Sequence, residues 1–414
     1  MPLPSRDSIK FSIENLFVLK EIFLVFYSWF DKAAQEGRLE MLAFDKNGAR
    51  IGDIKLIDVL PGKNERKAGT FVVSNRPAEN KFLSYGYKKI KGTSYINIDH
   101  IDYSGNKLQS QDFNIDNAGY VVHSFFDDEN LYRLVRNKAG NRNVKWSLNL
   151  YSPNSNNVQT VYLTLPSEEK IYLSNMFKSY TDKKDNLFFL SSYTTTALAK
   201  KAEGAYLVKV DLKTKQVIKE AAIPFKIGAQ NQAQDADFSL SSCVPVNIIP
   251  LQNGRIRILF ESRLLTLTYG VPSSYNMGDI ISVDIDSTYQ QVNNINVIKK
   301  KQITNPAKAI YSGFAPLTYN DTTFCIYNEL PQNLQRSADR LKNVSGAKMD
   351  ETVVIYAATP DPETPKKILI ERAEKSGTDA IMPRTLIKDK FKDGVIYILR
   401  KKDNGTILTK IIRG

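Results

Sequence analysis

Cysteine and histidine are both scarce in this sequence, with two residues of each type among 414. Zinc sites draw on these residue types at short spacings such as C-x-x-C or H-x-x-x-H, and no such spacing is present. Cys243 and Cys325 each lie in an apolar, strand-like run, which indicates two buried thiols rather than a disulfide framework. We therefore predict no metal site, and nothing in the sequence indicates a cofactor.

The sequence also lacks a long uninterrupted hydrophobic run. The nearest approach is Leu16 to Phe30 (LFVLKEIFLVFYSWF), which carries Lys20 and Glu21 in its middle. A membrane-spanning helix needs about 20 consecutive apolar residues, so we predict two adjacent buried strands here and no transmembrane segment. No small-residue cleavage site follows the run. We expect either a cytoplasmic protein or a chain given without the targeting segment of its precursor.

Catalytic signatures are missing as well. The sequence contains no G-x-S-x-G elbow, no P-loop and no dinucleotide-binding glycine pattern. His100 and His123 lie inside strand-like runs, and we interpret both as structural. Enzymatic activity is therefore not predicted, although carboxylates from distant segments can converge without any sequence signal.

What the sequence does have is the composition of a soluble, well-packed globular protein, with 42% hydrophobic, 10% aromatic and 24% charged residues. Its net charge is +13, but the basic clusters, such as Lys299 to Lys301 and Arg400 to Lys402, are short and scattered. No recognised nucleic-acid module surrounds them. We predict weak contact with anionic surfaces and no specific binding of nucleic acid.

Strand-like segments occur along nearly the whole chain, and the turns between them recur in two series. One series places Asn, Gly or Asp just before an apolar strand, at Asn80, Asn130, Asn186, Gly254, Asp321 and Gly394. The other follows a hydrophobic strand, at Asp45, Asp102, Asn154, Asp211, Asp286 and Asp361. These residue types tolerate the backbone of tight hairpin turns.

Two interleaved hairpin series indicate four strands in each repeating unit. Four-stranded antiparallel units that recur about every 40 to 70 residues are typical of a β-propeller. We predict an all-β propeller with seven blades, with six or eight as alternatives; a pair of β-sandwiches explains the doubled periodicity less well. The last unit offers only three candidate strands, and propellers commonly complete such a blade with a strand from the other terminus.

The predicted organisation is a single β-propeller domain over residues 11–414, after a flexible N-terminal segment at residues 1–10. The predicted blades lie near residues 11–58, 70–115, 120–165, 171–225, 243–300, 309–371 and 380–414.

Loops between the second and third strands lengthen in the later units, so we expect recognition on the face that carries them. The longest insertion, Glu329 to Asp350, has a short helical pattern and the cations Arg336, Arg340 and Lys342. As a functional element it would be a basic cap that docks an acidic ligand or partner. The interpretation favoured by the sequence is a solvated excursion whose apolar stripe rests on the propeller, because charged faces of surface helices need no special explanation.

A second insertion, Glu261 to Gly278, contains Arg263, Tyr269 and Tyr275. Aromatic side chains beside an arginine suit carbohydrate stacking or a protein hot spot, so these three residues are candidate ligand-binding residues. The polar stretch Lys226 to Ser242 holds two aspartates, but the full pattern of a calcium loop is absent, and we interpret it as a plain loop.

Several ordered motifs carry a resemblance to a known group: VVSNRPAENKFLSYGYKK, INIDHIDYSGNKL, GDIISVDIDS, the KKKQ tract from Lys299, and APLTYNDTTFCIYNE. On these motifs the chain resembles large, functionally uncharacterised, propeller-like proteins exported by Bacteroidota-type bacteria. The resemblance implies a location in the periplasm or at the cell surface. It brings no catalytic residues with it.

These observations predict a non-enzymatic propeller scaffold that binds a protein or glycan partner through its loop-rich face. The alternative is a carbohydrate-active enzyme, a glycoside hydrolase or polysaccharide lyase, with carboxylates near the propeller axis.

Overall fold

The computed structural model describes most of the chain. The described residues are 11–19, 22–74, 81–90, 93–116, 119–127, 129–139, 143–163, 172–182, 186–195, 202–214, 216–225, 243–268, 271–292, 295–305, 309, 312–319, 321–336, 340–345, 353–359, 367–371, 381–383, 387–388, 395–402 and 405–412. The predicted flexible segment at residues 1–10 and the predicted plain loop Lys226 to Ser242 lie outside the described residues.

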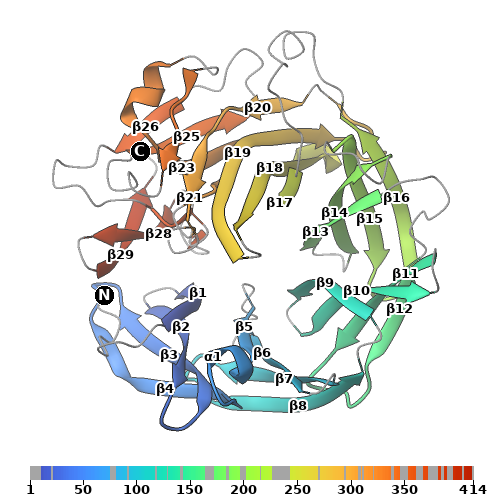
Figure 1. Cartoon of the computed structure of the whole chain (residues 1–414), viewed down its shortest axis with the longest axis vertical. Coiled ribbons are helices and arrows are strands. Elements are labelled where there is room, and N and C mark those ends of the chain that lie inside the picture. Colours follow the sequence, from blue (N-terminus) through green and yellow to red (C-terminus); the bar gives the residue numbers. More distant parts are fainter. Residues whose placement is uncertain are drawn as a thin grey trace. The chain divides into compact units, whose positions relative to one another are not determined.

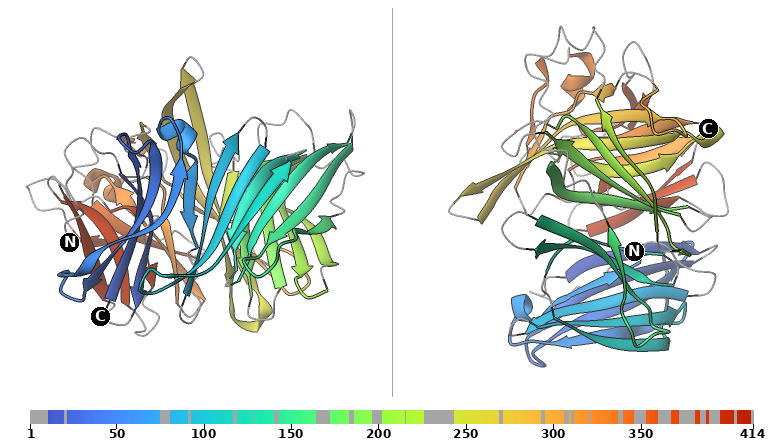
Figure 2. Two further views of the ribbon diagram at one scale, coloured as in Figure 1. Left: turned by 90° about the horizontal axis from the view of Figure 1, so that it is seen from below. Right: turned by 90° about the vertical axis from the view of Figure 1, so that its right-hand side faces the viewer.

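The chain divides into two compact units, which are described one at a time (Figures 1 and 2). Unit 1 comprises Met1–Leu165, Ile387–Tyr397 and Lys410–Gly414, and unit 2 comprises Pro166–Leu386 and Ile398–Thr409.

Unit 1 contains three four-stranded antiparallel sheets. Their orders are β1-β2-β3-β4, β5-β6-β7-β8 and β12-β11-β10-β9. The strands are β1 (Phe11–Leu19), β2 (Ile22–Asp31), β3 (Glu36–Asp45), β4 (Arg50–Pro61), β5 (Thr70–Val73), β6 (Lys81–Ile90), β7 (Thr93–Asp102), β8 (Lys107–Asp116), β9 (Gly119–Phe126), β10 (Leu131–Ala139), β11 (Asn143–Tyr151) and β12 (Gln159–Leu163). A single helical turn, α1 (Glu65–Ala68), precedes β5.

Unit 2 contains two further four-stranded sheets, β13-β14-β15-β16 and β22-β23-β25-β26, and a larger sheet with the path β17-β18-β19-β21-β24, on which β20 also pairs with β19. The strands are β13 (Tyr172–Thr181), β14 (Asn186–Thr194), β15 (Gly204–Asp211), β16 (Gln216–Pro224), β17 (Cys243–Pro250), β18 (Ile256–Thr268), β19 (Val271–Ile285), β20 (Asn296–Ile298), β21 (Gln302–Thr304), β22 (Ala315–Tyr319), β23 (Thr322–Glu329), β24 (Val344–Ser345), β25 (Val353–Thr359) and β26 (Lys367–Glu371). Two short 3₁₀ helices are η2 (Gln252–Gly254) and η4 (Pro331–Gln335). The last strands, β27 (Ile387–Lys388), β28 (Val395–Lys402) and β29 (Gly405–Ile412), form a three-stranded sheet.

The sheets are those of a β-propeller, because consecutive four-stranded antiparallel sheets, each built from one continuous stretch of chain, are the blades of that fold. The all-β propeller prediction is confirmed. The predicted number of blades, seven with six or eight as alternatives, is wrong. In the described part of the chain, five sheets are four-stranded. One further sheet has gained β24 from the insertion Glu329 to Asp350 and also includes the short strands β20 and β21. The last sheet has three strands, without a fourth strand from the N-terminus among the described residues.

The recurring turns form because an aspartate carboxylate accepts hydrogen bonds from backbone N–H groups two and four residues later. Asp102 Oδ1 accepts from the N–H groups of Ser104 and Asn106, at 2.8 Å each, in the turn between β7 and β8. Gly105 follows with φ at +85°, a left-handed conformation that glycine adopts without strain. Asp45 and Asp286 close the corresponding turns after β3 and β19 in the same manner. Asp211, after β15, accepts instead from the N–H groups two and three residues later. The predicted turn series are confirmed at these positions.

The apolar run from Leu16 to Phe30 forms the hairpin of β1 and β2, as expected. Its side chains contribute to a core shared with the next sheet, in which the rings of Phe17 and Phe82 lie 4.5 Å apart. Among the described residues, the structure contains no helix with the length and apolar character needed to cross a membrane. Cys243 and Cys325 are free and buried, and burial raises the pKa of each thiol to about 12.

Candidate functional site

The long hairpin of β18 and β19 carries two of the predicted binding residues. In Figure 2 this hairpin extends past the other strands of its sheet. Arg263 pairs with Met277 in the register, and Tyr275 lies two residues along β19 from that partner, so both side chains belong to one face of the hairpin. Tyr275 is half-buried and also pairs with Thr304 of β21. Tyr269, the third predicted residue, lies outside the described residues.

Arg263 is anchored at the base of this hairpin by a buried carboxylate. Its Nε donates to Glu261 Oε2 over 2.6 Å, and the other carboxylate oxygen accepts from Lys300 Nζ, also over 2.6 Å. Burial alone would raise the pKa of Glu261, but Lys300 and Arg263 outweigh burial and hold that pKa below its ordinary value. Burial has the opposite effect on a cation and lowers the pKa of Lys300, while the attraction of Lys300 to Glu261 opposes this lowering.

Gln302 connects this charged pair to the neighbouring strand β23. Its Oε1 accepts from Lys300 Nζ over 3.1 Å and from the Gly313 N–H over 2.8 Å, while its Nε2 donates to the Asn328 carbonyl over 2.8 Å. All the polar groups of the Gln302 side chain are therefore used inside the protein. This arrangement has no signature in the sequence, because Lys300 stands in a run of three lysines that resembles a solvated cluster.

The insertion that follows β23 folds as an ordered element. We use the name basic cap for residues 329–336 and 340–345, the described part of the predicted insertion. Asn333 holds it together: its Oδ1 accepts from the Lys342 N–H over 2.9 Å, and its Nδ2 donates to the Lys342 carbonyl over 2.8 Å and to Glu329 Oε1 over 2.6 Å. Leu330 and Val344 are buried against each other. The short strand β24 then pairs in parallel with β21, so the end of the basic cap becomes part of the sheet.

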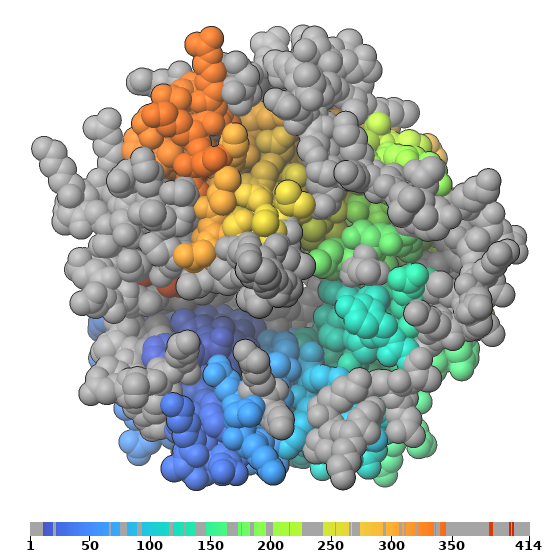
Figure 3. Space-filling model, in the orientation of Figure 1, coloured from blue at the N-terminus to red at the C-terminus, as the bar shows by residue number. Residues whose placement is uncertain are grey.

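The surface of the basic cap carries charge of one sign. Arg336, Arg340 and Lys342 are exposed, and Lys301 is exposed beside β24, to which its carbonyl accepts a hydrogen bond from the Val344 N–H. Within the described residues of the basic cap the one carboxylate is Glu329, which is fully buried. Figure 3 shows this part of the chain in orange on the face toward the viewer.

The candidate binding residues that the structure describes fall into two groups on one sheet path. Arg336, Arg340 and Lys342 share the basic cap, and Arg336 Nη1 donates to the Arg340 carbonyl over 3.1 Å. Arg263 and Tyr275 lie on β18 and β19 of the same sheet, whose path continues through β21 to β24. The apolar contact of Leu330 with Val344 and the exposed cations are the features that the solvated-excursion interpretation expects, and docking of a ligand stays a prediction.

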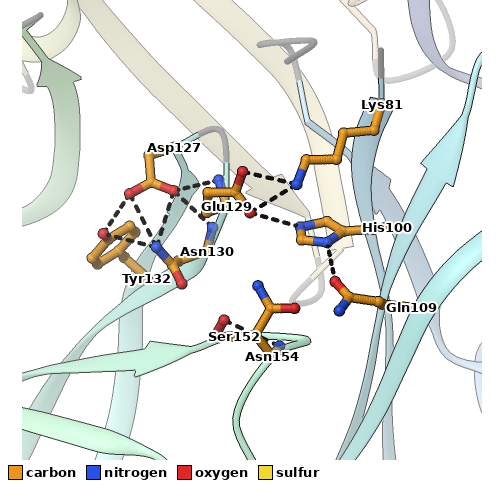
Figure 4. Close-up of polar contacts among 9 residues, drawn as sticks. All are labelled: Lys81, His100, Gln109, Asp127, Glu129, Asn130, Tyr132, Ser152 and Asn154. Carbon is orange, nitrogen blue, oxygen red and sulfur yellow. Dashed lines mark hydrogen bonds and ion pairs between the residues drawn. The ribbon is translucent and has the colours of Figure 1, made fainter. Parts of the chain in front are cut away.

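The two histidines lie in unit 1, away from the basic cap in the sequence. Figure 4 shows the surroundings of His100, in which Lys81 Nζ lies 2.8 Å from Glu129 Oε1 and His100 Nε2 lies 3.7 Å from Glu129 Oε2. His100 Nδ1 lies 3.0 Å from Gln109 Oε1. These contacts connect the sheet of β5 to β8 with the turn before β10, which agrees with a structural role. The ring of His123 stacks on that of Phe125 at 5.6 Å.

No group of three or more His, Cys, Asp or Glu side chains that could hold a metal ion occurs within the described ranges. The two aspartates of the stretch Lys226 to Ser242 lie outside those ranges.

Comparisons with known proteins give similarity of fold alone. No family model matches the sequence, and no curated protein matches it either. Among solved structures, the polysaccharide lyase Uly1 matches with 9% identity and a TM-score of 0.47, over 97% of this chain and 89% of that chain. The β-propeller domain of the Trilobed protease from Pyrococcus furiosus matches with 10% identity and a TM-score of 0.44, over 96% of this chain and 93% of that chain. Prolyl oligopeptidase B from Galerina marginata matches with 6% identity and a TM-score of 0.43, over 94% of this chain and 46% of that chain.

Proposed function

We propose that the protein is a non-enzymatic β-propeller scaffold that binds an acidic partner, a protein or a glycan, through its basic cap. The observation that carries the proposal is the set of exposed cations Arg336, Arg340 and Lys342 on a backbone that Asn333 fixes in place. A fixed backbone matters because a partner then has less conformational entropy to remove on binding. Exposed charges on such an element also steer an oppositely charged partner toward it.

The cations of the basic cap lie at its surface. The three cations lie outside the buried contacts of Leu330, Val344 and Asn333, which supply the packing. Solvent-exposed charges generally contribute little to stability. We therefore assign these three exposed cations a role in binding the partner.

The family resemblance and the location in the cell envelope stay proposals of the same kind. A partner in the envelope, where acidic glycans and acidic proteins are both present, would suit this surface. The alternative of a carbohydrate-active enzyme stays a prediction.

Affinity capture tests the proposal. A tagged full-length chain is compared with the cap variant R336Q/R340Q/K342Q, using an envelope extract of the source organism at low and high salt. The control variant K32Q/K46Q/K63Q removes three exposed lysines of unit 1 and so loses the same charge. We expect the wild type and the control to capture the same stoichiometric partner and the cap variant to lose it. Equal capture by all three chains would refute binding through the basic cap.

A further inference from the structure

Arg133 of β10 is a buried cation without a carboxylate partner in the part of the chain that the structure describes. Its side chain is 5% exposed, and neither Nε nor Nη1 has a hydrogen-bond partner. No carboxylate of the described residues forms an ion pair with it. Buried charges are normally paired, since an unpaired one costs several kcal/mol of desolvation. The charge and the unused N–H donors of Arg133 could therefore be paired by an anion that binds from outside the chain.

The strand register places a polar row beside this guanidinium. Ser124 of β9 and Asn149 of β11 are the direct partners of Arg133 on its two sides, so the three side chains belong to the same face of the sheet. Asn149 Oδ1 is also buried without a hydrogen-bond partner. Arg133 and Asn149 both act on the Tyr151 hydroxyl and partly offset the rise that burial causes in the pKa of Tyr151. The row thus offers unused N–H donors next to an unused carbonyl acceptor.

Two tyrosines of β6, in the adjacent sheet of unit 1, form the opposite wall. The guanidinium carbon of Arg133 lies 5.1 Å from the centroid of the Tyr87 ring, whose hydroxyl lies 3.0 Å from Ser94 Oγ. The Tyr85 hydroxyl forms a hydrogen bond with the Ser124 side chain, and burial raises the pKa of Tyr85, which keeps it neutral. The Tyr87 ring face attracts the guanidinium, but neither tyrosine supplies a negative charge that would neutralise Arg133.

The rim of this cluster is half-buried, whereas Arg133 Nε and Nη1 and Asn149 Oδ1 are buried behind it. Tyr85, Ser124 and Glu14 are half-buried, and Glu14 and Ser124 come from β1 and β9, the first strands of their sheets. Glu14 Oε1 accepts from Ser28 Oγ over 2.5 Å, and its charge acts on Tyr85. Glu14 thus supplies a carboxyl group at the rim, and Arg133 lies behind the Tyr85 and Ser124 side chains.

We propose that Arg133, Asn149, Ser124, Tyr85 and Tyr87 form a binding site for the carboxylate of an acidic sugar, a uronate. One guanidinium suits a ligand with a single negative charge better than a dianionic phosphate, because Arg133 is the one cation among the described residues that make up this cluster. The free Asn149 carbonyl accepts from a sugar hydroxyl. The tyrosine rings suit the apolar face of a pyranose. This site is separate from the basic cap and does not depend on it.

The test uses the full chain and two monosaccharide acids, D-glucuronate and D-galacturonate, in calorimetric titrations, with glucose and inorganic phosphate as comparison ligands. We expect saturable binding of a uronate and none of glucose or phosphate. R133M should weaken uronate binding at least about tenfold, since a charged hydrogen-bonding partner is lost. The matched control R136Q, on the same strand, should bind as the wild type does.

Thermal unfolding separates a binding role from a structural one. If Arg133 awaits a ligand, R133M removes an unpaired buried charge, so its melting temperature without ligand should equal or exceed that of the wild type. Uronate should raise the melting temperature of the wild type and leave that of R133M unchanged. A lower melting temperature of R133M, combined with no uronate binding by the wild type, would overturn the proposal and make Arg133 structural.

A second variant keeps the test decisive if R133M fails to fold. N149D places a carboxylate of nearly the same shape next to Arg133 and so supplies the missing counter-charge from within the chain. We expect a higher melting temperature and loss of uronate binding. Uronate binding by N149D equal to that of the wild type would contradict the proposed site.

Discussion

Lys300 and Glu261 form an ion pair from which water is excluded: Lys300 Nζ donates to Glu261 Oε1 over 2.6 Å, and neither side chain is exposed. The pair joins the long β18–β19 hairpin to the segment between β20 and β21. Through Gln302 it is also connected to β23, from which the basic cap begins. The basic cap, which is proposed to bind a partner, is therefore connected to a buried network of hydrogen bonds.

Removing one member of this pair is expected to destabilise unit 2 strongly. K300M leaves the Glu261 carboxylate buried with Arg263 as its remaining cation, and breaking a buried pair in this manner typically costs about 3 to 5 kcal/mol. K301M changes the exposed neighbour of Lys300 and should alter the free energy of unfolding by less than about 0.5 kcal/mol. Urea unfolding of both variants measures the difference. Equal stabilities would mean that the ion pair contributes nothing.

The same pair predicts a dependence of stability on pH. The pKa of Glu261 in the folded chain lies below its ordinary value of 4.5, because Lys300 and Arg263 outweigh the opposing effect of burial. The carboxylate therefore stabilises the fold fully above that ordinary value, and this contribution is lost as the pH falls through the folded-state pKa.

The variant E261Q isolates this contribution. We expect wild type to be more stable than E261Q at neutral pH, and the gap in unfolding free energy to narrow as the pH falls below about 4.5. Denaturant titrations at a series of pH values between 7 and 3 measure the gap. A gap that stays constant across the series would show that Glu261 is not the responsible group.

Asn333 is expected to control the order of the basic cap. N333A removes the hydrogen bonds to both backbone groups of Lys342 and to Glu329, so the backbone amide of Lys342 should exchange with solvent much faster. Q332A, at the exposed neighbouring position, provides the control. Hydrogen exchange measured by mass spectrometry should show the change in the basic cap and not in unit 1. Unchanged protection in N333A would mean that other contacts hold the cap.

Two glycines with positive φ allow a matched test of the turns. A Cβ at Gly105 would lie 3.1 Å from Met41 Cε and 3.1 Å from Lys55 Cβ, whereas nothing lies within 4 Å of a Cβ at Gly52. Both substitutions to alanine strain the backbone by about 1 kcal/mol, but G105A should lose more because neighbouring side chains must also move. Thermal unfolding of the two variants measures the difference. A larger loss in G52A would contradict this description of the turn.

Much of the fold follows from local sequence chemistry. The aspartate turns at Asp45, Asp102, Asp211 and Asp286 depend on hydrogen bonds within four residues, and their spacing alone indicates four-stranded sheets. The hairpin of Leu16 to Phe30 follows from the charges in its middle. The number of four-stranded blades was not predictable in this manner, because β24 joins β21 across a separation of more than thirty residues that no local pattern marks.

The sites were predictable only where their residues stand at the surface. The cations of the basic cap lie in one continuous insertion and could be found from its composition. Lys300 could not be found from composition, because the sequence does not distinguish a buried lysine from an exposed one in a run of three lysines. Its partner Glu261 also belongs to a different segment of the chain. Arg133 was missed for a similar reason: a charged residue in a strand points inward or outward according to a register that pairing with distant strands decides.

Titration of a defined polyanion tests the central claim, that the basic cap binds an acidic partner, most directly. The wild type, R336Q/R340Q/K342Q and K32Q/K46Q/K63Q would each be titrated with polygalacturonate and with poly-L-glutamate at low and at physiological salt. The account predicts that the cap variant binds about tenfold more weakly than the other two chains, since three exposed contacts contribute roughly 0.5 kcal/mol each. It also predicts that added salt narrows this difference. Equal affinities of the cap variant and the control variant at both salt concentrations would contradict the account.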